Sequence, residues 1–402
     1  MNKKTEYGLI TVLTSVSLLL LLFLLTGNNF TDINGYNTYA LQANRWRQGF
    51  LDLGQDYVWL ELAIYQGKYY CSFPPFPSCI LFPLTFIFGS QTPDYLIMFI
   101  VDIILVMYLY LIGVELEMKA EDALILTLLA TMGANTLFIM IHPGVWFFAQ
   151  LICFATAAMA IYYALLGKGG LSLFLWGCSV GCRPMQVLFL PILLALLYRK
   201  ERKDNEELPA WKLVMRKWYW GLPVSMIAGF YMLLNYLRFG SILEFGHNYL
   251  PEFMRAEYGQ FHISYLENNI KSLLRLPQIN DSGAMIINHF GDLNFLFVNP
   301  IIVAVLIGWL WMILKKDGVI FAWGMVVMCL VLDYLLVIAM HKTLGAWQFG
   351  NRYVIDILPY VFLLGAMLFS KYKKPGKYLL PLLIFGVGLN VFGTVVVMNG
   401  LK

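Results

Sequence analysis

The sequence contains few charged residues. Only 13% of its 402 residues are Asp, Glu, Lys or Arg, whereas 60% are hydrophobic. Soluble domains average about 25% charged residues. The mean hydropathy is +0.69. This composition excludes an ordinary soluble globular protein and predicts a chain that crosses a membrane many times.

Several motifs that identify other classes of protein are also missing. The chain has no P-loop, no G-x-G-x-x-G and no H-E-x-x-H pattern, which argues against nucleotide use and against a zinc site. We therefore predict no cofactor, and no residue pattern supports a divalent metal. Nothing suggests a nucleic-acid partner. No repeat or second domain is visible, so residues 1–402 are treated as one transmembrane domain.

The six cysteines are scattered, without a Cys-x-x-Cys pair. A disulfide between Cys71 and Cys79 is one possibility if both lie outside the membrane. Six reduced, structural thiols are the favoured interpretation.

Long apolar runs predict an all-α membrane protein with about eleven transmembrane helices, because lipid cannot satisfy open backbone groups. The N-terminal basic flank and apolar run have no cleavage site after them, so we expect a retained first span. The predicted spans lie near residues 9–25, 79–89, 95–114, 122–141, 144–166, 171–198, 218–237, 299–314, 319–340, 353–370 and 378–398.

The basic residues predict the orientation of these spans. With the N-terminus in the cytoplasm, short inner segments such as 199–217 and 371–377 contain more than half of all Lys and Arg residues. This agrees with the positive-inside rule for a multi-pass plasma-membrane protein. Two long outer loops, about 26–78 and 238–298, are then the expected functional face.

The first outer loop contains an expected interfacial amphipathic helix at residues 31–49. Tyr39, Ala40 and Ala43 recur on its apolar face, Gln42 lies on its polar face, and Gly49 suits a C-terminal cap. Asp32 has two interpretations. It is either the N-cap of this helix or a general base held at the membrane surface.

The segment G67-KYYCSFPPFP-S78 is rich in aromatic residues and proline. Its prolines cannot lie inside a helix, so we expect an extended path into the second span. The aromatic side chains either form a belt at the lipid headgroups or line a site for a lipid-borne ligand.

These stretches resemble bacterial GT-C-fold integral membrane glycosyltransferases. An Asp at the start of the first loop, the helix, and GKYY…FPPFPS are similar to that family in their order. GCRPMQVLFLPILL (181–194), NYLRFGSILEFGHNY (235–249) and FGNRYVIDILPYVFLL (349–364) support the resemblance. Two departures are Ile33 and Asn34, where many members have an acidic pair after the aspartate, and Phe76, where glycine is common. The first of these leaves metal dependence open.

The resemblance implies an enzyme that moves a sugar from a polyprenyl-phosphate carrier to a lipid- or polymer-linked acceptor on the outer face. The family's catalytic aspartate corresponds to Asp32. Fixed cations would stabilise the departing phosphate. Predicted contacts to the donor phosphate and carrier are Arg352, Lys68, Arg183, Tyr69, Tyr70 and Phe73. The predicted acceptor cleft contains Asp56, Glu61, Glu244 and His247.

Two of these cations have alternative structural roles. Arg352 could instead form an i,i+4 ion pair with Asp356. Arg183 lies about twelve residues, or roughly 18 Å, into a predicted straight span. An arginine at that depth is either functional or paired with a buried acid.

Three functions therefore remain open from the sequence. The leading one is an inverting glycosyltransferase. The alternatives are a transporter or flippase of a lipid-linked glycan, and a non-catalytic partner in envelope assembly. A transporter would be expected to show repeats or charges along a through-path, whereas here the polar residues gather on one side.

Overall fold

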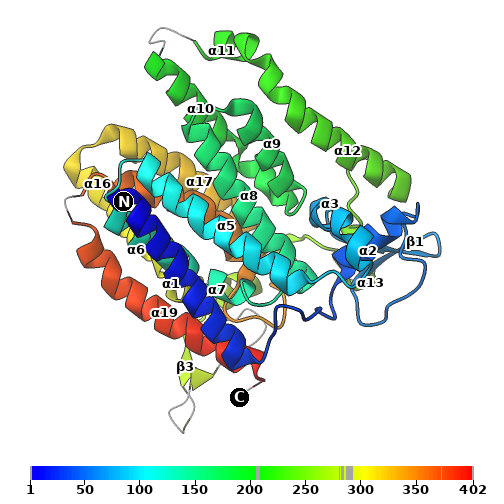
Figure 1. The fold of residues 1–402 in the computed structure, drawn as a ribbon. Helices are drawn as coiled ribbons and strands as arrows, with labels where there is room; N and C mark the ends of the chain where they lie inside the picture. Colours follow the sequence, from blue (N-terminus) through cyan, green and yellow to red (C-terminus); the bar gives the residue numbers. More distant parts are fainter. Residues whose placement is uncertain are drawn as a thin grey trace. The chain divides into compact units, whose positions relative to one another are not determined.

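The computed structural model describes residues 2–204, 209–279, 281, 285–286, 293–372 and 374–400. The chain is predominantly helical (Figure 1). It forms two compact units. Unit 1 contains residues 1–29, 99–141 and 263–402, and unit 2 contains residues 30–98 and 142–262.

Seven of the described helices are long and apolar enough to cross a membrane. They cover Lys3–Thr26, Asp94–Glu115, Val145–Leu165, Trp218–Phe239, Gly318–Ala339, Arg352–Phe369 and Gly376–Met398. Shorter apolar helices cover Phe76–Phe88, Gly169–Val180 and Pro300–Met312. These helices support the predicted all-α, multi-pass membrane architecture.

Unit 1 is built around α18, whose residues are almost all buried. Its elements are α1 (Lys3–Thr26), α5 (Asp94–Glu115, which begins in unit 2), α6 (Ala120–Thr131), α7 (Thr136–Ile139), η5 (Ile263–Tyr265), α14 (Leu266–Leu273), β3 (Gln278–Ile279), β4 (Met285–Ile286), α15 (Phe295–Val298), α16 (Pro300–Lys315), α17 (Gly318–Ala339), η6 (Arg352–Ile357), α18 (Leu358–Phe369) and α19 (Gly376–Met398). Close helix approach depends on glycine: a Cβ on Gly386 of α19 would lie 2.3 Å from the carbonyl oxygen of Gly133.

Helices α1 and α5 are antiparallel. The Tyr110 hydroxyl, near the end of α5, donates to the Lys4 carbonyl at 2.6 Å. Lys4 lies in the first turn of α1. Residues 27–93 therefore begin and end at the same end of this helix pair. A single crossing at 79–89 would make the two helices parallel, so that predicted span is wrong.

Helix length explains why 79–89 does not cross. The chain there forms three short pieces, α3 (Phe76–Leu81), η1 (Phe82–Leu84) and α4 (Thr85–Phe88). Thirteen helical residues extend only about 20 Å, whereas the hydrocarbon core is about 30 Å thick. Pro83 also interrupts the α-helical hydrogen bonds. Hydropathy alone does not reveal this.

Unit 2 combines these short pieces with a layer of long helices. Its other elements are α2 (Thr38–Arg47), β1 (Leu62–Tyr65), β2 (Lys68–Cys71), α8 (Val145–Leu165), α9 (Gly169–Val180), η2 (Pro184–Phe189), α10 (Leu190–Asp204), α11 (Ala210–Arg216), η3 (Trp218–Trp220), α12 (Gly221–Phe239), η4 (His247–Tyr249) and α13 (Pro251–Met254). Figure 1 shows α2, α3, β1 and α13 gathered together.

The predicted span at 171–198 is two segments that run in opposite directions. Helix α9 ends at Val180, and the chain turns through Gly181–Arg183 before η2 and α10. A Cβ on Gly167, just before α9, would lie 3.1 Å from Cγ of Lys200 near the end of α10. The start of α9 and the end of α10 therefore lie side by side. Arg183 is at the turn rather than deep within one straight helix.

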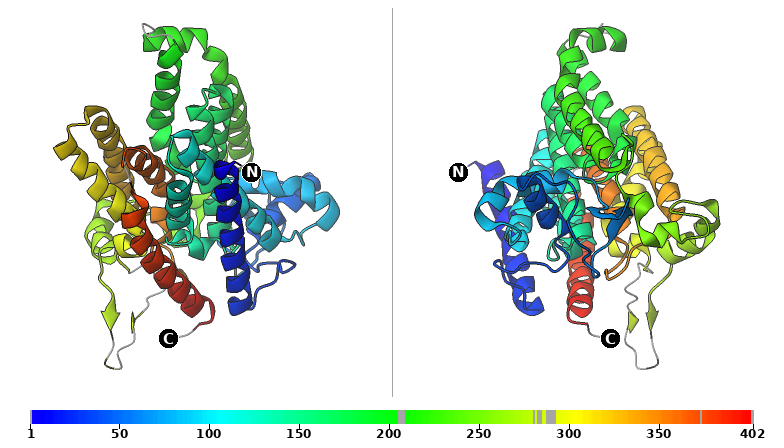
Figure 2. Two further views of the ribbon diagram at one scale, coloured as in Figure 1. Left: turned by 60° about the vertical axis from the view of Figure 1, so that its left-hand side comes forward. Right: turned by 90° about the vertical axis from the view of Figure 1, so that its right-hand side faces the viewer.

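The two chain ends lie at opposite ends of unit 1. The Asn399 side chain, just after α19, donates to the Leu25 carbonyl near the end of α1 at 3.2 Å. Helices α1 and α19 are therefore parallel, and the N-terminus is at the far end of α1 from the C-terminus (Figures 1 and 2). The loops at 315–317 and 371–377 meet at one end, where Lys371 pairs with Asp317 at 3.0 Å.

The revised chain path predicts which loops are accessible from outside. In intact cells, an impermeant thiol reagent should label a cysteine introduced at Gln55. It should not label cysteines introduced at Lys168 or Lys212, because the basic end should face the cytoplasm. Replacing the exposed Cys329 by serine removes background. Labelling at Lys168 but not at Lys212 would restore the single-span path through 171–198.

Candidate functional site

A β-hairpin that the sequence analysis did not anticipate forms the base of the first loop. Strand β1 pairs antiparallel with β2, with Leu62 opposite Cys71 and Tyr65 opposite Lys68. Gln66 and Gly67 connect the strands with φ values of 50° and 72°. Two positive φ values in a two-residue loop define a type I′ turn, which matches the twist of paired strands. Gln66-Gly67 between aromatic and apolar residues was the available signal.

The helix predicted at 31–49 is shorter and more buried than expected. It covers Thr38–Arg47, and Gly49 follows its end with φ 84°, as the predicted C-terminal cap requires. Its N-cap is Asn37, so the N-cap interpretation of Asp32 is wrong. Gln42 is also buried and accepts a hydrogen bond from Ser78 at 2.8 Å, because the packing of α3 covers that face.

Asp32 lies half-buried in a loop that is anchored on both sides. The Asn34 backbone N–H donates to both carboxylate oxygens of Asp94, at 3.1 and 3.2 Å. The Asn34 side chain accepts from the Tyr36 N–H at 2.8 Å and also hydrogen-bonds Tyr95. The Tyr36 carbonyl accepts from Val145 at 3.0 Å. These contacts anchor the loop that contains Asp32 on its C-terminal side.

Aromatic side chains and a carboxylate surround the end of this loop. The Trp59 indole donates to the Gly35 carbonyl at 3.1 Å, and the Trp146 indole donates to the Glu61 carboxylate at 2.8 Å. The Tyr36 and Trp146 rings are 5.1 Å apart. Trp59 is 62% exposed. We call Tyr36, Trp59, Glu61 and Trp146 the aromatic–carboxylate cluster. Of these, only Glu61 was predicted from the sequence as a site residue, and Tyr36 was expected on the apolar face of the interfacial helix.

The segment 67–78 is not extended throughout. Lys68–Cys71 is a strand, and Pro77 lies in the first turn of α3, where a missing N–H is tolerated. Tyr70 and Phe73 are buried: Tyr70 packs on Phe239 at 5.2 Å, and Phe73 on Tyr39 at 6.3 Å. Their rings therefore fill the protein interior rather than form a surface.

The other two residues of this segment that were predicted to contact the donor, Tyr69 and Lys68, already contact protein groups. Tyr69 packs against the apolar cluster of Leu53, Leu60 and Leu62. The Lys68 ammonium lies 3.9 Å from the Asp52 carboxylate. Such an exposed pair is weak, so Lys68 keeps the freedom to contact another anion. Asp56 is exposed on the same loop.

Three stretches that supported the family resemblance meet within unit 2. The Phe76 N–H donates to the Gly181 carbonyl at 3.0 Å, which brings segment 67–78 against the turn that contains Arg183. The Ser72 carbonyl lies 2.5 Å from His247 Nδ1. Arg183 is near enough to Tyr39 to interact electrostatically with its hydroxyl. The sequence order alone could not show this convergence.

Burial controls the protonation of Tyr39 and Cys71, which lie where these three stretches meet. Desolvation raises the pKa of the Tyr39 hydroxyl well above its ordinary value. It also raises the pKa of the Cys71 thiol to about 11. Both groups are therefore neutral near pH 7 and are unsuited to act as a base or nucleophile. All six cysteines are free thiols.

Glu244 and His247 hold the loop after α12. The Glu244 carboxylate accepts from the Gly246 N–H and from the Asn248 amide, both at 2.6 Å. His247 donates through Nδ1 to Ser72 and stacks on Phe253 at 5.9 Å. Nearby, Arg238 donates to the Cys71 carbonyl at 3.3 Å. These side chains position the loop against β2.

Arg352 belongs to unit 1, where it is 5% exposed at the start of η6. Its N–H donates to Gln348 at 2.9 Å, and its guanidinium lies 4.6 Å from the centre of the Tyr353 ring. Asp356 lies four residues after Arg352 in η6, a 3-10 helix with three residues per turn. Asp356 accepts from the Tyr334 hydroxyl at 2.7 Å.

Within the described residues, no group of three or more His, Cys, Asp or Glu side chains could hold a metal ion. No known protein-family model matches the chain, and no curated protein matches it either. Function must therefore be inferred from the geometry of the site.

Gly246 lies close to Phe239 and to the Ser72 backbone, so its substitution should destabilise the protein. Gly246 has φ 107°, and an added Cβ would lie 2.9 Å from Phe239 and 3.2 Å from the Ser72 backbone. Gly246→Ala should lower the free energy of unfolding by about 1–3 kcal/mol, through backbone strain and overpacking. Thermal unfolding of the purified protein in detergent should give a lower midpoint for this variant than for the wild type. Gly221→Ala is the matched control, because nothing lies within 4 Å of its Cβ. Equal midpoints for both variants would contradict the argument.

Proposed function

We propose that this protein is an inverting GT-C-type glycosyltransferase. It would transfer a sugar from a polyprenyl-phosphate carrier to a lipid- or polymer-linked acceptor on the outer face of a bacterial plasma membrane. One observation supports this most strongly. The half-exposed Asp32 is on a loop anchored through its backbone, and the same loop contributes to the aromatic–carboxylate cluster.

The proposed reaction needs a base, an acceptor platform and a cation. Asp32 would take the proton from the acceptor hydroxyl as that oxygen bonds to the anomeric carbon and the bond to the carrier phosphate breaks. Trp59 and Trp146 offer flat apolar faces, held in place by the hydrogen bonds of their N–H groups to Gly35 and Glu61, and such faces suit a sugar ring. Glu61 would accept a hydroxyl hydrogen bond from the acceptor.

The departing phosphate gains negative charge and needs fixed positive groups. Arg183 is the best candidate in unit 2, because it follows Gly181, which is hydrogen-bonded to Phe76. Lys68 is a second candidate. Arg352 belongs to unit 1, and its contact with the donor phosphate stays a prediction from the sequence. Since Tyr70 and Phe73 are buried, we now assign them to packing. The exposed Phe50 and Val58 are better suited to contact the carrier chain.

The proposal also assigns a membrane path. We propose eleven crossings, as α1, α5, α6–α7, α8, α9, η2–α10, α12, α16, α17, η6–α18 and α19. The number equals the one expected from sequence, but 79–89 stays on the loop side and 171–198 crosses twice. With the N-terminus cytoplasmic, Asp32 and the aromatic–carboxylate cluster face outside. A lipid-linked donor is available there, whereas a cytosolic nucleotide sugar is not.

Replacement of the proposed base should separate chemistry from binding. Asp32→Asn should lower single-turnover transfer by about 10²–10⁴-fold, because proton removal is lost. Affinity for a labelled polyprenyl-phosphate sugar should stay close to that of the wild type, since the loop is anchored by its backbone. Full transfer by Asp32→Asn would eliminate it as the base. Glu257→Gln makes the same carboxylate-to-amide change at an exposed acid with no assigned role and serves as the control.

The role of Arg352 can be tested without removing its charge. Arg352→Lys keeps a cation but loses the planar fork that binds phosphate through two bonds. We expect kcat/KM for the donor to fall by about 10²-fold, with an unchanged thermal midpoint. Arg255→Lys, at an exposed arginine, should have no effect. If Arg352→Lys lowers the midpoint while kcat/KM is retained, Arg352 has a packing role.

One observation favours the transporter alternative. Asp102 is fully buried in α5, and neither of its carboxylate oxygens has a hydrogen-bond partner among the described residues. Acids inside membrane spans often mark proton or substrate paths. The same single-turnover assay distinguishes the two functions, because a transporter moves an intact lipid-linked glycan and releases no free carrier.

A further inference from the structure

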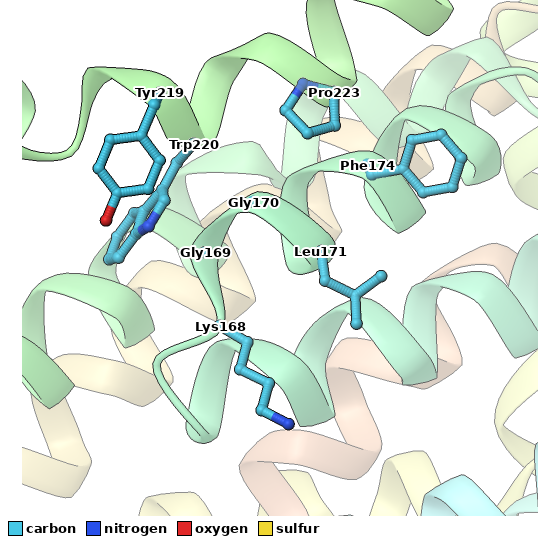
Figure 3. A pocket seen from close by; sticks show the side chains of 8 residues that line it. All are labelled: Lys168, Gly169, Gly170, Leu171, Phe174, Tyr219, Trp220 and Pro223. Carbon is cyan, nitrogen blue, oxygen red and sulfur yellow. The ribbon is translucent and has the colours of Figure 1, made fainter.

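A cavity of about 510 Å³ lies between the start of α9 and the start of α12 in unit 2. Figure 3 shows Lys168 and Leu171 extending from the α9 side and Tyr219, Trp220 and Pro223 from the α12 side. The lining is apolar and aromatic. Lys168 is the one charged side chain among the described residues that line it.

The cavity is located where membrane spans end. The apolar span of α8 finishes at Leu165, three residues before Lys168, and the next candidate span begins at Trp218. Tyr219 is 48% exposed and Leu171 is 41% exposed. Tyrosine and tryptophan concentrate at the membrane–water boundary. We therefore expect this cavity to lie at the level of the lipid headgroups.

Positive charge is concentrated around this cavity. Lys168 lies 5.7 Å from the centre of the Tyr163 ring, and Lys200 packs beside Gly167. Lys217 lies 5.0 Å from the centre of the Trp220 ring and pairs with Glu201 at 3.0 Å. Among the residues that the structure describes, three lysines and one carboxylate therefore lie around or next to the apolar interior.

We propose that this cavity binds an anionic phospholipid. The lipid phosphate would contact Lys168, and one acyl chain would lie along Leu171, Phe174 and Pro223. A soluble anion would leave the apolar lining in water, whereas a phospholipid covers the lining and places its phosphate beside these lysines. This site is independent of the proposed transferase reaction, because it is formed by the opposite end of α9 from Gly181.

Two neighbouring glycines, Gly169 and Gly170, show where a larger side chain could fill the cavity. A Cβ on Gly169 would lie 2.1 Å from the Trp220 ring, so glycine is needed there for Trp220 to pack against α9. Gly170 is different. Its nearest neighbours would be 3.8 Å or more from a Cβ, in Trp220 and Pro223. A leucine at position 170 can therefore enter the cavity without a backbone clash.

The test uses full-length, delipidated protein and native mass spectrometry with added phosphatidylglycerol or phosphatidylcholine. Wild type should bind the first phosphatidylglycerol about fivefold more tightly than phosphatidylcholine, as expected for about 1 kcal/mol from one lysine at a membrane surface. Lys168→Gln should remove this preference. Gly170→Leu should weaken the binding of both lipids. Lys212→Gln makes the same charge change on α11, away from the cavity, and should match wild type.

Two outcomes would overturn the proposal. The first is equal affinity of wild type for both lipids. The second is an equal loss of preference in Lys168→Gln and Lys212→Gln, which would indicate diffuse surface charge rather than a site. Should Gly170→Leu fail to fold, Lys168→Gln decides alone: unchanged affinity for phosphatidylglycerol in that variant rejects the site.

Discussion

The hydrogen bonds from the Asn34 N–H to the buried Asp94 carboxylate fix the first loop. A carboxylate that is removed from water must be satisfied by donors nearby, and Asp94 receives both the Asn34 and Tyr95 N–H groups. This ties the loop after α1 to the first turn of α5. If the loop shifted, the Asp94 carboxylate would be exposed to water or would lose a hydrogen-bond donor. Asp32, two residues before Asn34, therefore lies on a loop that the Asn34–Asp94 contact anchors.

The sequence predicted part of the fold, and tertiary contacts determined the rest. Composition and long apolar runs were enough to predict a helical membrane protein, because hydropathy reports how much apolar surface a segment has. They did not establish in which direction each apolar segment runs relative to its neighbours. The run at 79–89 and the run at 171–198 both have the composition of a span, yet one is too short and the other turns at Gly181–Arg183. Direction was set by contacts such as that between Tyr110 and Lys4.

The candidate site was predictable only in part for a similar reason. Asp32 and Glu61 are acids of the first loop, as the sequence indicates, but Trp146 lies 85 residues from Glu61 in the chain, and no local pattern links them. Tyr70 and Phe73 have the composition of an exposed aromatic belt, and tertiary packing buries them. Local pattern does not say which face of a short strand will be covered. The Gln66-Gly67 turn was a local signal, and it would have predicted the hairpin.

The two ends of unit 2 differ in chemistry, and this difference restricts the substrate. One end contains Asp32, Glu61 and exposed tryptophan, whereas the other contains Lys168, Lys200 and Lys217 around an apolar cavity. The positive-inside rule assigns the lysine end to the cytoplasm. The proposed transfer at the acidic end would then have no access to cytosolic nucleotide sugars, so its donor would have to cross the membrane attached to a lipid. Within the proposed transferase function, the charge asymmetry of unit 2 is therefore a reason to expect a lipid-linked donor.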